Sequence, residues 1–86
     1  MIIYNVKIED RFGMNDSLLS TDDKQLAEET VKVVKLLFKN VKATIGFRFE
    51  EMNTHHVWWY DEYFSNQFLE DIWNELKERG FDPSYC

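Results

Sequence analysis

The chain has 86 residues, 44% hydrophobic and 16% aromatic, with a formal net charge of −6. This aromatic content excludes a disordered chain, and the length suits one domain over residues 1–86. No stretch approaches the roughly 20 apolar residues of a membrane span, and the N-terminus lacks the basic region of a secretion signal. We therefore expect a single folded domain of the cytoplasm.

Cys86 is the single cysteine and the last residue. One cysteine excludes an internal disulfide framework and a zinc site built on several thiolates. We interpret it as a free thiol, which agrees with a reducing compartment.

The negative charge is concentrated in the second half of the chain. Residues 1–49 hold eight Lys/Arg and seven Asp/Glu, a net +1, whereas residues 50–86 hold two and nine, a net −7. Such a field repels phosphate backbones, so we do not expect direct binding of nucleic acid there. This negative charge favours a basic partner. The alternative is that the charge serves only to keep the protein soluble.

The first part of the chain predicts a strand, a connection and a helix. Apolar residues alternate with polar ones over residues 2–9, which indicates a half-buried strand. Residues 10–20 are rich in turn formers and predict a long connection, with a short extra strand around Leu18 as an open alternative. Ser20 to Asp23 can cap a helix that runs to about Lys39, with apolar residues at the helical period.

The clearest pattern lies between residues 41 and 60. Odd-numbered residues from Val41 to Phe49 are apolar and alternate with polar ones, which predicts a strand with Phe47 in the core. Residues 51–54 would turn the chain, and residues 55–60 would return as an antiparallel strand rich in rings. We predict a β-hairpin over residues 41–60.

The register of this hairpin decides which tryptophan faces outward. A turn of two or four residues places Phe47 opposite Trp58 and leaves Trp59 on the outer side over Gly46. Arg48 would then reach the ring of Trp59 for a cation–π contact. A turn of three residues reverses the assignment.

A second helix is predicted from about Asp61 to Arg79. Apolar residues recur every four positions, and Gly80 is placed to end the helix in the left-handed conformation. The resulting β-α-β-β-α order predicts an α+β two-layer sandwich, a three-stranded, mainly antiparallel sheet with two helices on one face. This order resembles a ferredoxin-like sandwich that stops before its fourth strand, a topological likeness that implies no function.

The chain carries little that suggests chemistry. His55 and His56 are adjacent, with three carboxylates nearby, but neighbours in a strand point to opposite faces and do not easily hold one ion. The glycines are isolated, so no phosphate-binding loop is present. We predict no stoichiometric zinc or iron, no cofactor and no catalysis; a small enzyme or metal-binding protein is the third alternative.

An exposed ring beside a dense acidic field suits protein binding, because rings anchor a contact and charge steers it. In size and charge the chain resembles small acidic viral proteins that occupy the basic nucleic-acid channels of restriction or CRISPR nucleases. The leading hypothesis is such an acidic interaction domain, which binds through the second helix and the outer sheet face. The alternative is a homodimeric structural or adaptor protein that pairs through its open sheet face or edge. The predicted partner-binding residues are Trp59, Arg48, His55, Glu62, Glu70, Asp71, Glu75 and Glu78.

Overall fold

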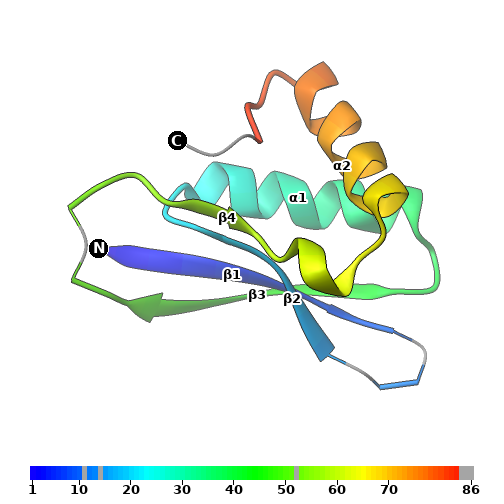
Figure 1. Ribbon diagram of the computed structural model, residues 1–86, viewed down its shortest axis with the longest axis horizontal. Helices are drawn as coiled ribbons and strands as arrows, with labels where there is room; N and C mark the ends of the chain where they lie inside the picture. Colours follow the sequence, from blue (N-terminus) through cyan, green and yellow to red (C-terminus); the bar gives the residue numbers. More distant parts are fainter. Residues whose placement is uncertain (11, 14, 52, 84–86) are drawn as a thin grey trace.

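The computed structural model describes residues 1–10, 12–13, 15–51 and 53–83. Their elements follow in the order β1 (Ile2–Glu9), β2 (Asn15–Thr21), α1 (Lys24–Leu37), β3 (Lys42–Phe49), β4 (Val57–Trp59), the 3-10 helix η1 (Asp61–Tyr63) and α2 (Asn66–Glu78). The strands form one antiparallel sheet, and both helices lie on the same side of it (Figure 1). The predicted α+β class with two helices is confirmed. No helix in the described ranges is both long and apolar enough to cross a membrane.

The sheet has four strands rather than the predicted three, because residues 15–21 form β2 instead of a connection. The alternative of an extra strand around Leu18 is confirmed. β1 and β2 make a hairpin, and Gly13 in its turn has a φ of +81°. Val6 pairs with Leu19 and Lys7 with Ser17, so Leu18 is an extra residue, a β-bulge. The bulge disturbs the alternation along the strand, and Leu18 and Leu19 are both fully buried.

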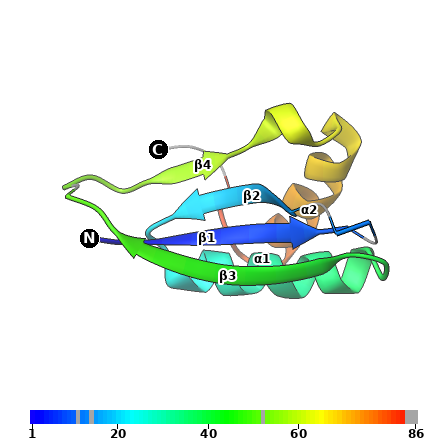
Figure 2. The ribbon, with the colours of Figure 1, turned by 90° about the horizontal axis from the view of Figure 1, so that it is seen from below.

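The predicted hairpin over residues 41–60 is wrong. The strand order is β3-β1-β2-β4, which places β3 and β4 at opposite edges of the sheet (Figure 2). β2 fills the position beside β4, so Trp59 pairs with Leu19 and Phe47 pairs with Tyr4 rather than Trp58. The connecting residues cross the end of the sheet, where the terminal amine of Met1 donates to the Glu50 carbonyl at 2.8 Å.

The core lies between the sheet and the two helices. It consists of strand residues on one sheet face and of the apolar sides of both helices, among them Val6, Ile8, Leu19, Leu26, Val33, Val34, Trp59, Ile72 and Leu76. Side chains on this face of β3 become more exposed along the strand, from Ala43, which is buried, to Phe47, which is 77% exposed. The predicted core position of Phe47 is therefore wrong, because the helical layer covers only the first part of β3.

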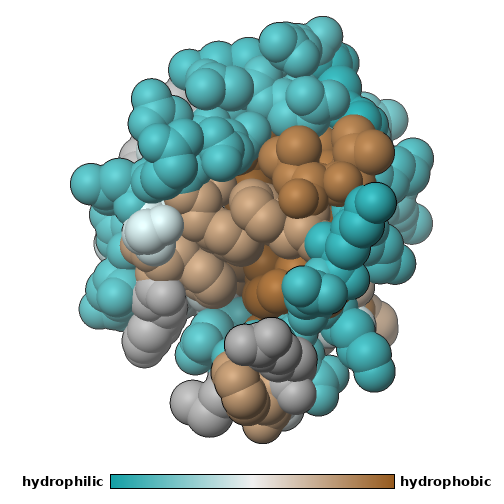
Figure 3. Space-filling view, turned by 90° about the vertical axis from the view of Figure 1, so that its right-hand side faces the viewer, coloured by the Kyte–Doolittle hydropathy of each residue, from teal (hydrophilic) through white to brown (hydrophobic). Residues whose placement is uncertain are grey.

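Three stacked rings extend the core where α1 ends and α2 begins. Phe38 and Phe68 stack with centroids 4.4 Å apart, and Phe64 stacks on Phe68 at 5.1 Å. All three are partly buried against the core cluster. The view toward this end of the molecule has a continuous apolar area bordered by polar residues (Figure 3).

The start of α1 and the end of α2 agree with the signals in the sequence. The predicted start of the second helix at Asp61 is wrong, because residues 61–63 form η1 and Ser65 caps α2. Asp23 caps α1, and its carboxylate accepts from the amides of Gln25 at 3.0 Å and Leu26 at 3.2 Å. Gly80 follows α2 with a φ of +87°, and its amide donates to the Lys77 carbonyl. The predicted left-handed end of the second helix is confirmed.

We expect Asp23→Ala to lower the free energy of unfolding by about 1 kcal/mol, because two amides of the first turn lose their acceptor. Asp23→Asn is the matched control, since the amide oxygen still accepts. Urea unfolding followed by circular dichroism measures both variants. Equal stability of Asp23→Ala and the wild type would contradict the capping role.

Candidate partner-binding site

The predicted anchor, Trp59, is buried. Its ring is fully enclosed in the core and meets Trp73 edge to face, with centroids 5.8 Å apart. Its indole Nε1 donates to the Pro83 carbonyl at 2.6 Å. Trp58 is the outward tryptophan, at 52% exposure, opposite Ser20 on β2. Trp59 thus cannot touch a partner in this conformation, and its predicted exposure is wrong because β4 pairs with β2.

Arg48 lies on the outer face of the sheet and is already engaged. Its guanidinium donates to Glu50 and, at 3.5 Å, to the hydroxyl of Ser20. The hydrogen bond to Glu50 raises the pKa of Arg48 above its ordinary value. The predicted cation–π contact between Arg48 and Trp59 is wrong, because Trp59 lies on the opposite face of the sheet, in the core.

His55 holds the connection between β3 and β4 in place. Its Nδ1 lies 2.8 Å from an Asp22 carboxylate oxygen, and the same oxygen accepts from the amide of His56 at 2.9 Å. Asp22 in turn donates its amide to the His56 carbonyl. These contacts give His55 a structural role at the end of β2.

The acidic residues of the second helix fall into two groups. Glu62, Glu70 and Glu78 are exposed. Asp71 instead accepts from Gln67 Nε2 at 2.7 Å, and Glu75 accepts from Arg79 Nε at 3.2 Å. Only the carboxylates of the first group have neither a hydrogen bond nor an ion pair within the described part of the chain.

Arg79 joins the two helices. Its Nη1 lies 2.9 Å from Glu29 on α1, while its Nε contacts Glu75 on α2. The Glu29 carboxylate, together with that of Glu75, raises the pKa of Arg79 above its ordinary value. Glu75 therefore belongs to an interhelical contact, which reduces its availability to a partner.

The predicted binding surface is divided between two sides of the sheet. α2 lies on the helical side, whereas Arg48 and Trp58 share the outer face with Asn5 and Ser20 (Figure 2). A partner with one flat surface cannot contact α2 and the outer face of the sheet at the same time. What the structure does bring together is a group of residues along α2 and the preceding 3-10 helix.

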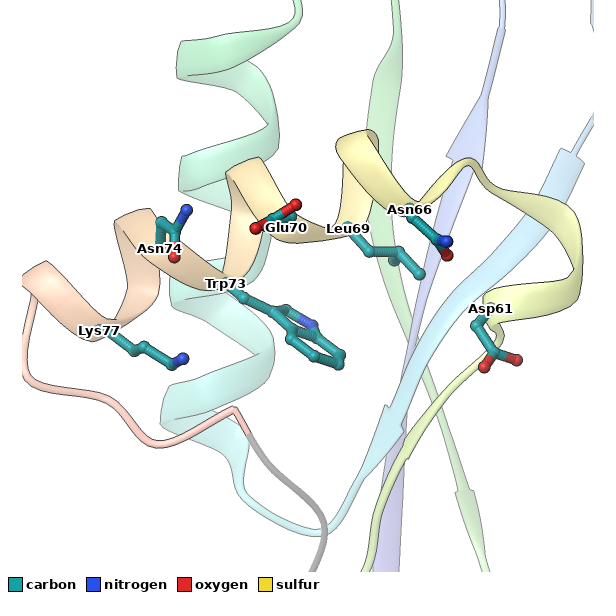
Figure 4. A pocket seen from close by; sticks show the side chains of 7 residues that line it. All are labelled: Asp61, Asn66, Leu69, Glu70, Trp73, Asn74 and Lys77. Atoms are coloured by element: carbon teal, nitrogen blue, oxygen red, sulfur yellow. The ribbon is translucent and has the colours of Figure 1, made fainter.

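These residues line a pocket of about 340 Å³, formed by Asp61, Asn66, Leu69, Glu70, Trp73, Asn74 and Lys77. Six of them come from α2, and Asp61 lies across from the helix at the start of η1 (Figure 4). The Trp73 ring projects into the space between them. We call this the Trp73 pocket.

The Trp73 pocket combines an aromatic surface with charges of both signs. Trp73 Nε1 is buried and has no hydrogen-bond partner in the described structure. Asp61 and Glu70 are exposed and form no ion pair there, and Lys77 supplies one positive charge. Because this donor has almost no exposed area, a ligand in the pocket would meet the ring and the charged groups rather than Nε1.

Sequence reasoning included Glu70 in the site but missed Asp61 and Trp73. Asn66, Glu70, Trp73 and Lys77 follow the three- and four-residue spacing that places side chains on one side of a helix. That spacing could have predicted that the four residues lie together. It was overlooked because Trp73 also fits the apolar pattern of the core.

The predicted absence of a metal stays a prediction. In the described ranges no three His, Cys, Asp or Glu side chains are grouped so that they could hold an ion. Cys86 lies outside the described residues. Comparison of the chain with protein families, curated proteins and solved structures finds no match.

Proposed function

We propose that the protein is an acidic interaction domain that binds a basic protein segment along α2, with a lysine or arginine side chain in the Trp73 pocket. The observation that carries this proposal is the pocket itself, in which two carboxylates without ion pairs flank an indole ring. A guanidinium or ammonium over a tryptophan face is attracted by the ring, and the carboxylates add charge-assisted hydrogen bonds.

The net −7 of residues 50–86 would speed encounter with a basic surface at low ionic strength. The basic nucleic-acid channel of a restriction or CRISPR nuclease is a surface of this kind, and an inhibitor role remains our proposal on grounds of charge.

Several expectations remain proposals beside this one. They are the absence of catalysis, cofactor and direct nucleic-acid binding, and the cytoplasmic location. The likeness to a truncated ferredoxin-like sandwich also stays a prediction, and it carries no functional weight because one fold hosts many functions.

The proposal is tested with a fluorescent arginine-rich peptide titrated against the protein in a salt series. We expect Glu70→Lys to weaken binding by about tenfold or more, because a charge pair in the pocket becomes a repulsion. Glu78→Lys makes the same change of charge on the same helix outside the pocket lining, so its effect should be several-fold smaller.

Trp73→Phe tests the contribution of the indole ring. The variant keeps an aromatic ring against Trp59 but offers a cation a smaller ring face, and we expect weaker peptide binding. Equal losses in Glu70→Lys and Glu78→Lys would mean that charge acts without the pocket. Binding of a duplex DNA probe in preference to the peptide would contradict the proposal outright.

A further inference from the structure

Strand β3 is an eight-residue edge of the sheet, and within the described residues it pairs only with β1. The other edge strand, β4, has three residues. An edge strand presents unpaired backbone groups that can pair with another chain, and native proteins usually shorten, charge or cover such edges. β3 is long and carries apolar rings, so it has little of this protection.

The apolar side of β3 is exposed along its second half. Phe47 and Phe49 are 77% and 73% exposed, and Ile2, which pairs with Phe49, is 46% exposed. Directly paired residues share a sheet face, so these side chains form one apolar area beside the helical layer. Ala43, at the other end of the strand, is small and buried.

Nothing in the described part of the chain requires a glycine at position 46, in the middle of β3. A Cβ added there would meet no atom within 4 Å, and its φ is not positive. Glycine inside a strand weakens it and often marks the close approach of another backbone. The outer edge of β3 is where such a backbone can come.

We propose that two copies of the chain pair through β3, antiparallel about a two-fold axis at Gly46. In this register Ile45 faces Phe47 of the second copy, and Ala43 faces Phe49 of the second copy. The pair of Ile45 and Phe47 joins a β-branched residue to a ring, a pairing that stabilises antiparallel strands, and the small Ala43 leaves room for the ring of Phe49. Such an interface is self-complementary, as two-fold symmetry requires.

Charge fits the same register. Lys42 forms no ion pair in the described structure and would face Glu50 of the second copy, a carboxylate that also accepts from Arg48 of its own chain. Residues 42–50 contain two basic and one acidic side chain, so this strand is free of the strong negative charge of the second half of the chain. The inference does not depend on the Trp73 pocket.

Sedimentation of the full chain tests the pairing, up to about 100 µM, above the micromolar range of weak association. We expect a dimer, and we expect Phe47→Asp to raise its dissociation constant about 100-fold or more, as for a central ring of an interface. Phe12→Asp is the matched control, because Phe12 is equally exposed at 77% but lies in the β1–β2 turn. A monomeric wild type, or a dimer that survives Phe47→Asp, would overturn the proposal.

Cysteine cross-linking tests the register. In a Cys86→Ser background, Gly46→Cys should form a disulfide between copies under mild oxidation, since opposed strand residues lie within reach of a disulfide. Thr44→Cys should not, because the two Thr44 positions would be about 13 Å apart along the strands. Cross-linking through Thr44 but not Gly46 would contradict the axis.

Discussion

Trp59→Ala is expected to lower the free energy of unfolding by about 3–5 kcal/mol. The ring is fully buried, contacts Trp73 and donates to the Pro83 carbonyl, so the variant loses apolar burial and a hydrogen bond and leaves a cavity. A small domain has a total stability of only roughly 5–15 kcal/mol, so this variant should be close to unfolding at 25 °C.

The neighbouring Trp58→Ala is the control for this measurement. Trp58 is half exposed on the outer face, and we expect a loss below about 1 kcal/mol, within the range of strand propensity. Chemical unfolding with both variants decides the assignment. Equal midpoints, or a larger loss in Trp58→Ala, would mean that the two rings are placed on the wrong faces.

Ile3→Ala is expected to lower the free energy of unfolding by about 2–5 kcal/mol. Ile3 pairs with Arg48 on the outer side of the sheet, yet it is fully buried, and it lies outside the main core cluster. It therefore marks a second, smaller buried region near the end of the sheet that the connection after β3 crosses. Loss of this side chain should destabilise that end without a cavity in the main core.

Ile2→Ala serves as the comparison, since Ile2 has the same side chain one position earlier and is largely exposed. We expect it to cost below about 1 kcal/mol, as is usual for exposed positions. Thermal unfolding of dilute protein keeps any association out of the comparison. A cost for Ile2→Ala as large as that for Ile3→Ala would contradict the second buried region.

Periodicity predicted the elements with a regular pattern. The first strand, both helices and the Gly80 end of α2 were found because their signals lie within a few residues. β2 was predicted only as an alternative, a short strand around Leu18, because its sequence, NDSLLST, begins with turn formers and has a bulge that breaks the alternation. Without a period of two, the pattern could not decide between a strand and a connection.

The order in which the strands pair could not be predicted from the sequence pattern. Neighbouring strands in the chain often pair, and on that basis the hairpin over residues 41–60 was reasonable. Once β2 exists, however, it separates β3 from β4 and changes the position of every ring between residues 47 and 60. The exposure of Trp58 and Phe47 and the assembly of the Trp73 pocket depend on that order, which no local pattern encodes.

The strand order also sets how the chain must fold. Only the β1–β2 pairing is local, whereas Val6 pairs with Ile45 and Leu19 with Trp59, partners about 40 residues apart. Long-range pairing requires loops to close before any contact stabilises them, and it slows folding. We expect refolding in milliseconds to seconds rather than microseconds, with the β1–β2 hairpin as the template on which both edge strands must assemble.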